Sequence, residues 1–252
     1  MSGARDLLWW STGGPSFIMC GLVLRENPDA IIVRCETNNE DPDNYRFEAD
    51  AMLRLNRSVT LLRSEKYESV PDVWRDRRYM SGIKGAPCTV EMKVAPRLAF
   101  QMPTDRHMFG YTADSEDVDR FERLKANYPE LTVRAPLIEH GITKASGLAM
   151  VERAGLELPR SYAMGFPNAN CLQTGCVKAT SPDYWALYRH HFPENFARTA
   201  AYAREIGARL TRIKGERIFI DEIPADWPTR NPIVPRCDFL CAIAEQGLET
   251  AE

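Results

Sequence analysis

The chain has 252 residues, of which 44% are hydrophobic and 27% charged, and its formal net charge at pH 7 is -3. This composition is typical of a folded protein, and the negative charge argues against a mainly electrostatic nucleic-acid binder without excluding such a partner. No apolar stretch approaches the roughly 18 residues of a membrane span, and the N-terminus lacks the pattern of a secretory signal. We therefore expect a cytoplasmic protein without membrane contact, whose seven cysteines are free thiols or metal ligands rather than disulfides.

Apolar runs alternate with helical patterns along residues 1–157. A buried strand at residues 7–10 leads through a short loop into an apolar helix that reaches residue 24. Four more strands are predicted at residues 30–35, 58–62, 107–111 and 131–138. Helices are predicted at residues 44–55, 70–79, 89–101 with a kink near Pro96, 114–126 and 143–154. The alternation predicts an α/β domain with a mostly parallel five-stranded sheet and helices on both faces.

Residues 158–252 have a different pattern. Helices are predicted near residues 182–191 and 194–207, one strand near residues 217–221, and proline-rich connections between them. We find no internal repeat and no low-complexity linker. We therefore expect a mainly helical, cysteine-bearing C-terminal extension that packs on the first domain.

The loop at residues 11–16 reads Ser-Thr-Gly-Gly-Pro-Ser and lies between the first strand and the first helix. Glycines let the backbone approach an anion, and a helix N-terminus adds unpaired N–H donors and the positive end of the dipole. The pattern therefore predicts a phosphate site. An ordinary strand-to-helix turn with two glycines would have the same pattern.

Two close pairs of cysteines occur in the extension: Cys171 with Cys176, and Cys237 with Cys241. Two such pairs can converge as the thiolate ligands of zinc or of an iron–sulfur cluster. Cys88 precedes a predicted helix, where the dipole would lower the pKa of its thiol, so we expect a reactive thiolate or a further ligand there. The alternative is that these cysteines are small buried hydrophobic residues.

Five segments occur in a fixed order: residues 11–16 with residues 37–38, then residues 87–96, 109–120, 136–144 and 170–178. In this order they resemble the PP-loop ATP pyrophosphatase superfamily, and more narrowly its phosphoadenosine phosphosulfate reductase-like branch with its phage-type members. The resemblance implies a nucleotide alpha hydrolase-like fold. It also implies that ATP or a related adenine nucleotide, with Mg²⁺ as an accompanying ion, binds at the carboxyl ends of the strands. It favours a [4Fe–4S] cluster over zinc at the cysteines.

The resemblance also implies roles for individual residues. Lys93 and Arg120 would neutralise phosphate or sulfate and join Cys88 as catalytic residues, although a surface lysine and a helix salt bridge are the simpler readings. Thr37 and Asn38 would lie near the adenosine. The complete set implied for nucleotide binding is Ser11, Thr12, Gly13, Gly14, Ser16, Thr37, Asn38 and Gly110.

Two departures from the family limit what the resemblance implies. Where the superfamily loop carries Lys-Asp, this chain has Gly14 and Pro15, and proline removes an amide donor and a carboxylate that could help to hold Mg²⁺. The chain also ends without the Glu-Cys-Gly tail of the reductases, which argues against true phosphosulfate reduction.

We therefore predict a nucleotide-binding PP-loop enzyme that adenylates a substrate or handles sulfur, as a sulfur-transferase or reductase-like enzyme. The alternative is a non-catalytic protein that senses a nucleotide or binds a partner and retains the fold. The sequence does not identify the acceptor substrate, and it is compatible with a homodimer. If the protein is phage-encoded, it would act in the cytoplasm of the host.

Overall fold

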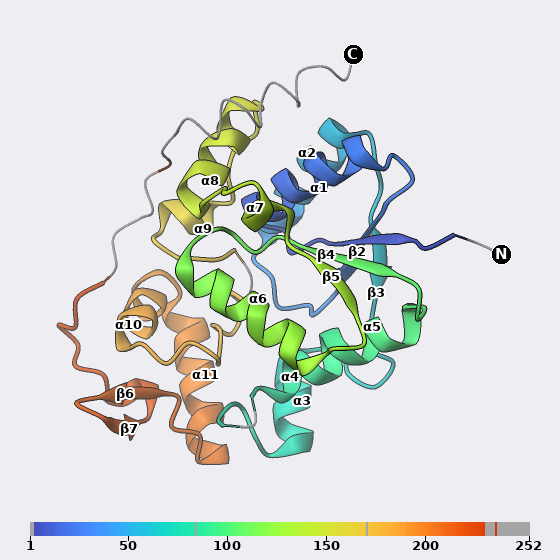
Figure 1. The fold of residues 1–252 in the computed structure, drawn as a ribbon. Coiled ribbons are helices and arrows are strands. Elements are labelled where there is room, and N and C mark those ends of the chain that lie inside the picture. Colours follow the sequence, from blue (N-terminus) through green and yellow to red (C-terminus); the bar gives the residue numbers. More distant parts are fainter. Residues whose placement is uncertain (1–2, 84, 170, 230–234, 236–252) are drawn as a thin grey trace.

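A five-stranded parallel sheet in the order β3-β2-β1-β4-β5 forms the centre of the computed structural model, which describes residues 3–83, 85–169, 171–229 and 235 (Figure 1). The strands are β1 (Asp6–Trp9), β2 (Ile31–Cys35), β3 (Thr60–Leu62), β4 (Arg106–Phe109) and β5 (Thr132–Arg134). Both faces are covered, which is why Leu7, Leu8 and Ile32 are almost fully buried. The predicted α/β fold class is confirmed.

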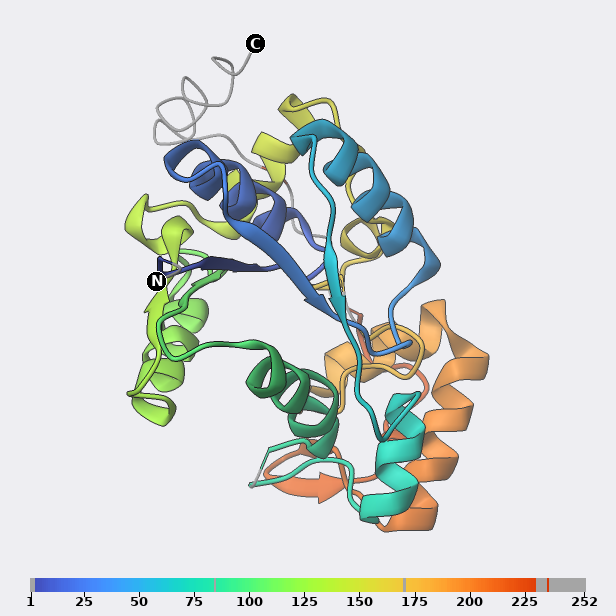
Figure 2. The same cartoon turned by 90° about the vertical axis from the view of Figure 1, so that its right-hand side faces the viewer.

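Helices cover both faces of the sheet (Figures 1 and 2). One face carries α1 (Gly14–Glu26), α2 (Pro42–Leu55), α7 (Pro136–Glu139) and α8 (Lys144–Arg153), and the other carries α5 (Ala95–Phe100) and α6 (Ser115–Asn127). α1 is apolar on all sides because it packs between the sheet and α8. The strand order reverses at β1, so the loop between β1 and α1 lies at the switch point where open α/β sheets bind ligands.

The connection from β3 to β4 is helical. It contains α3 (Val70–Arg77), then α4 (Pro87–Thr89), the π-helical turn η1 (Val90–Val94) and α5 in direct succession. We predicted a helix that is interrupted or kinked near Pro96, and the π-helical turn η1 interrupts it directly before Ala95. Pro96 stands in the first turn of α5, where its missing N–H is tolerated, and the wider π turn precedes it.

The described part of the C-terminal extension is mainly helical. It contains α9 (Arg160–Ala163), α10 (Pro182–His191), α11 (Pro193–Ile206), the antiparallel strands β6 (Thr211–Ile213) and β7 (Glu216–Ile218), and the 3-10 turn η2 (Ile220–Glu222). Trp185 and Tyr188 of α10 share a hydrophobic core with Trp74 of α3, and all three side chains are fully buried. The extension therefore packs against the segment between β3 and β4. The domain boundary at residue 157 stays a prediction.

Two predicted strands differ from the structure. The strand expected at residues 131–138 ends at Arg134, because Pro136 has no N–H for a sheet and starts α7 instead. The strand expected at residues 217–221 is part of a hairpin, and its turn at Lys214 and Gly215 has positive φ angles of 50° and 87°. Within the described residues, no helix is long and apolar enough to cross a membrane.

Candidate functional site

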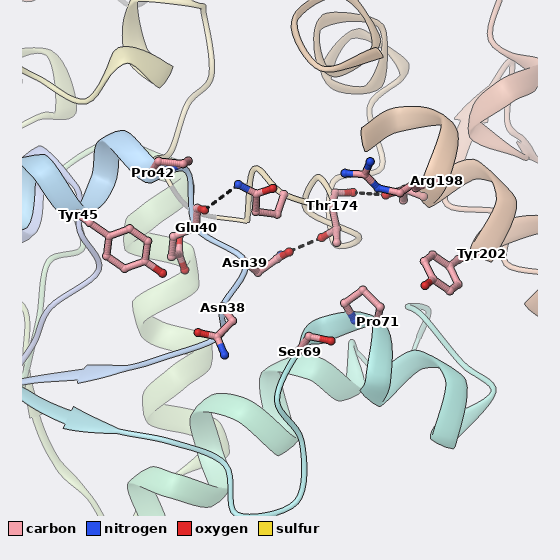
Figure 3. Close-up of a pocket in the computed structure, with 12 residues that line it drawn as sticks. Asn38, Asn39, Glu40, Pro42, Tyr45, Ser69, Pro71, Thr174, Arg198 and Tyr202 are labelled. Atoms are coloured by element: carbon pink, nitrogen blue, oxygen red, sulfur yellow. Dashed lines mark hydrogen bonds between the residues drawn. The ribbon is translucent and has the colours of Figure 1, made fainter. Parts of the chain in front are cut away.

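A polar pocket lies beyond the carboxyl ends of β2 and β3, with a cavity volume of about 430 Å³ (Figure 3). Its walls come from the loop after β2, the start of α3, the loop before α10, and α11. The lining combines amide and hydroxyl groups with tyrosine rings and an arginine, and includes Asn38, Asn39, Ser69, Thr174, Arg198 and Tyr202. This size and this mixture of groups are typical of small-molecule sites.

The loop after β2 folds around the carboxylate of Glu36. This carboxylate accepts the backbone N–H groups of Thr37 (3.0 Å) and Asn38 (2.9 Å), and Asn38 adopts a left-handed φ of 49°. Burial acts to raise the pKa of Glu36, but the Asn38 N–H and the Arg34 guanidinium outweigh it and hold the pKa below its ordinary value. As a result Asn38 lines the pocket, whereas Thr37 is buried and donates its hydroxyl to Glu40.

The base of the polar pocket ties the loop after β2 to the extension (Figure 3). Asn39 donates a side-chain N–H to Thr174 Oγ1 (2.8 Å), and the backbone N–H of Gln173 donates to the Asn39 carbonyl (3.0 Å). The hydroxyl of Thr199, on α11, donates to the Thr174 carbonyl (2.8 Å). Arg198, the neighbouring residue, is exposed beside the pocket. The pocket is therefore formed jointly by the sheet edge and the extension.

The predicted phosphate loop, residues 11–16, connects β1 to α1 at the switch point. Within it the Gly13 carbonyl accepts the N–H groups of Ser16 (3.1 Å) and Phe17 (3.3 Å) and the hydroxyl of Ser16 (2.7 Å). Gly110, just after β4, lies so close that a β-carbon on it would stand 3.2 Å from Ser16 Cα. The described lining of the polar pocket includes neither this loop nor Gly110.

The side chain of Tyr162, on α9, covers the glycine loop. Tyr162 is 4% exposed, and burial raises the pKa of its phenol. The phenol oxygen accepts a hydrogen bond from the Gly14 N–H. Leu148, on α8, packs against Gly14 from the other side. Of the residues predicted to bind phosphate, Ser11 is exposed and the others are buried: Thr12, Gly13, Gly14 and Ser16.

Three cysteines gather next to the polar pocket, and we call Cys88, Cys171 and Cys176 the thiol cluster. The thiols of Cys171 and Cys176 are hydrogen-bonded to each other, and Cys88 interacts electrostatically with Cys176. Backbone contacts hold the pair: the Cys171 N–H donates to Glu40 (3.1 Å), and the Cys176 N–H donates to the Tyr184 hydroxyl (2.7 Å). The cluster therefore shares Glu40 with the pocket.

The structure describes only two of the four cysteines that were predicted to form a metal centre. Cys171 and Cys176 lie together, whereas Cys237 and Cys241 fall outside the described residues. In the part of the chain that the structure describes, no three His, Cys, Asp or Glu side chains are arranged to hold a metal ion. The four-cysteine centre, with iron–sulfur or zinc, therefore stays a prediction.

The acidities of the three thiols differ. The hydrogen bond from Cys171 lowers the pKa of Cys176 against the effect of burial, with help from the Lys178 N–H, while the pKa of Cys171 is raised. Burial raises the pKa of Cys88, which is opposite to our expectation. The reason is burial: the Cys88 thiol packs in the core around Trp74, and this outweighs the effect of the helix N-terminus.

The two predicted cations lie in different surroundings. Lys93, in η1, faces Cys171 and Glu40, and although burial acts to lower its pKa, these partners raise it. Arg120 forms an ion pair with Asp117 (N···O 2.7 Å) one turn earlier on α6, with half of its side chain exposed. The described lining of the polar pocket includes neither cation. Their catalytic roles, and that of Cys88, stay predictions.

In metal-free protein, we expect a thiol-alkylating reagent to modify Cys176 well before Cys88, and to keep doing so at mildly acidic pH. The reason is that the thiolate is the nucleophile, and the pKa of Cys176 is lowered while that of Cys88 is raised. Peptide mass spectrometry across a pH series measures both rates. Cys171→Ala should slow the reaction of Cys176, and buried Cys20 is the unreactive control. Equal rates that rise together near pH about 8.5 would contradict this prediction.

Several residues of the site were not predicted from the sequence. Arg198 and Tyr202 lie on a helix whose pattern is that of an ordinary amphipathic surface helix, so only packing reveals that they line a pocket. Tyr162 stands in a short turn with no motif around it. Glu40 belongs to the polar run after β2, and its position past a buried strand was a usable signal.

Comparisons with known proteins support the fold. No family model matches the chain, and no curated protein matches it either. Among solved structures, the chain is similar to phosphoadenylyl-sulfate (PAPS) reductase from Candida auris, determined as a phosphate complex. The two share 11% sequence identity, the match covers 68% of this chain and 82% of that chain, and the TM-score is 0.50. The predicted resemblance to this group of proteins therefore holds at the level of the fold, and the phage-type branch stays a prediction.

Proposed function

We propose that the polar pocket binds an adenine nucleotide. The observation that carries this proposal is the pocket itself: a cavity of about 430 Å³ at the carboxyl edge of a parallel sheet, lined by amides, hydroxyls and tyrosine rings. Open α/β sheets bind ligands at this edge. The likeness in fold to a PAPS reductase is consistent with the proposal.

The lining groups suit the parts of a nucleotide. The side-chain nitrogens of Asn38 and Asn39 donate within the chain, so their carbonyl oxygens remain acceptors for an exocyclic amino group such as that of adenine. Tyr45 and Tyr202 line the pocket and can contact the base or the ribose, and the Tyr45 hydroxyl, which donates to Glu36, can still accept a hydrogen bond. The exposed guanidinium of Arg198 can form a charge-assisted pair with a phosphate.

We expect AMP to bind the wild-type protein and Arg198→Ala to bind it about tenfold more weakly, because one charge-assisted contact is lost. Isothermal titration calorimetry measures both affinities. Arg54→Ala is the matched control, since Arg54 is exposed near the far end of α2 and does not line the pocket. Failure of adenosine, AMP and ATP alike to bind the wild type would refute the proposal. An unchanged affinity of Arg198→Ala would remove Arg198 from the site.

The first candidate for the nucleotide-bound protein is an enzyme that adenylates a substrate or handles sulfur, with Mg²⁺ accompanying a nucleoside triphosphate, and this candidate requires that the triphosphate bind. A non-catalytic nucleotide sensor is the second candidate. It is favoured by the loop after β1, where Gly14 and Pro15 stand and where Tyr162 takes the Gly14 N–H. Release of pyrophosphate from ATP separates the two, because only the enzyme would release it.

The four-cysteine centre can be tested by its metal. We expect anaerobically purified protein to carry iron and acid-labile sulfide with the visible absorption of an iron–sulfur cluster, and Cys176→Ser to lose most of the metal. Metal analysis and the absorption spectrum measure this. Cys20→Ala, in the core of α1, should retain the metal. Protein free of iron and of zinc would show that the centre does not exist.

A further inference from the structure

The hydrogen-bond donors at the start of α1 are taken up by the chain itself. The Gly14 N–H donates to the Tyr162 hydroxyl, and Pro15 has no N–H. The next two N–H groups, of Ser16 and Phe17, both donate to the Gly13 carbonyl. The Phe17 bond is the ordinary first bond of the helix, whereas a phosphate at this helix end would need the N–H groups of Gly14 and Ser16. The glycine loop, as it stands, therefore does not fit the phosphates that its sequence predicts.

The space beside the two glycines is also filled. A β-carbon on Gly13 would stand 2.9 Å from the Tyr162 hydroxyl, and one on Gly14 would stand 2.8 Å from Leu148 Cδ2. Glycines allow close approach of a ligand, but here the approaching groups are side chains of α8 and α9. The Tyr162 phenol oxygen therefore lies at the helix N-terminus, where an oxygen of a bound phosphate would lie.

An ion pair and several hydrogen bonds hold α9 in this position. The Arg160 guanidinium bonds to both carboxylate oxygens of Asp41 (2.9 and 2.7 Å), and the Arg160 N–H donates to Asp43 (2.7 Å). Asp41 is the N-cap of α2, and Arg46 of the same helix donates to the Leu158 carbonyl (3.1 Å). The start of α2 follows the pocket loop. Its contacts with α9 therefore hold the Tyr162 phenol beside the glycine loop.

We propose that Tyr162 determines ligand specificity by excluding a polyphosphate chain from the glycine loop, so that the protein takes an adenine nucleoside or nucleoside monophosphate in preference to ATP. The adenine part of this inference rests on the proposed function, whereas the closure of the loop does not. To bind at the loop, a diphosphate or triphosphate chain would have to displace a buried phenol and break the contacts of Arg160 with α2. A ligand with one phosphate, held in the polar pocket, meets neither obstacle.

The test compares adenosine, AMP, ATP and inorganic pyrophosphate by calorimetry. The wild type is expected to bind ATP no more tightly than AMP and not to bind pyrophosphate. Tyr162→Ala should bind pyrophosphate and raise the affinity for ATP relative to AMP about tenfold. Tyr162→Phe should change this ratio little, because its ring still fills the space. A wild type that prefers ATP about tenfold, or a folded Tyr162→Ala with an unchanged ratio and no pyrophosphate binding, overturns the inference.

A second variant provides a test if Tyr162→Ala does not fold, and circular dichroism shows whether each variant is folded. Arg160→Lys replaces the two guanidinium contacts with a single ammonium and keeps a cation beside Asp41, whose side chain is 2% exposed, so the fold should tolerate it, and loosening α9 should shift the ATP to AMP ratio in the same direction. Arg54→Ala is again the control. If adenosine and AMP fail to bind the wild type, the proposed function fails, yet pyrophosphate binding to the variants still reports on the closure of the loop. If ATP binds Tyr162→Phe more weakly than it binds the wild type, Tyr162 holds the phosphates rather than excluding them, and the inference is wrong.

Discussion

Lys93→Met is expected to lower the free energy of unfolding by about 3 kcal/mol at neutral pH, because the variant leaves the Glu40 carboxylate buried without its cation. Glu40 is 6% exposed, and burial raises its pKa. The Lys93 charge is the largest influence that lowers this pKa in the native protein. Without Lys93 the pKa of Glu40 rises further, so folding above that pKa requires either an unpaired buried charge or the uptake of a proton.

The sign of the pH dependence follows from linkage. The native pKa of such a carboxyl group lies above its unfolded value of about 4.3. The group does not change the free energy of unfolding at a pH where the native and the unfolded protein are both protonated. It lowers this free energy increasingly as the pH rises toward the native pKa. The loss in Lys93→Met should therefore be larger at about pH 8 than near pH 4.

Urea unfolding at the two pH values measures the loss in Lys93→Met. Lys66→Met, at an exposed lysine, is the control with little change. Adding Glu40→Gln to Lys93→Met should recover part of the loss at high pH, because the buried charge is gone. An equal loss at both pH values would mean that Lys93 stabilises the fold by packing alone.

Much of the fold could be predicted because its signals are local. The strands at β1 and β2 are short apolar runs, and α2 begins at an Asp-Pro cap whose Asp41 carboxylate accepts the Asp43 N–H. The errors also have local causes. Pro136 lies inside residues 131–138, which were predicted as one long strand, and the turn at Lys214 and Gly215 was not recognised as a hairpin turn.

The site could be predicted only in part, because its decisive contacts join distant segments. Asn38 was expected near the adenosine because of the family resemblance, and the structure has it in the lining of the polar pocket. The phenol of Tyr162 on Gly14, and Arg198 beside the pocket, depend on how the extension packs, which no local pattern of residues determines. The pKa of Cys88 was predicted in the wrong direction because burial in the core around Trp74 outweighs the effect of the helix N-terminus.

Gly175→Ala is expected to destabilise the protein by about 3 kcal/mol and to abolish AMP binding, through strain and overpacking together. Gly175 has a φ of +70°, and a β-carbon on it would stand 2.7 Å from the ring of Trp185 and 3.2 Å from that of Tyr188. Neither ring can move freely, since the Trp185 indole donates to Ala179 (2.8 Å) and the Tyr188 hydroxyl donates to Leu172 (3.0 Å).

The effect on binding follows from the neighbours of Gly175. Thr174 forms the base of the polar pocket and Cys176 belongs to the thiol cluster, so a shift of this backbone disturbs both. Gly155→Ala is the matched control, because Gly155 has a similar φ of +78° but nothing within 4 Å of its added β-carbon. It should show the cost of the left-handed conformation alone, about 1 kcal/mol, with AMP binding intact. Thermal unfolding and calorimetry on the two variants separate backbone strain from steric clash. Equal losses of stability and of AMP affinity in both variants would show that the rings of α10 move aside for the new methyl group.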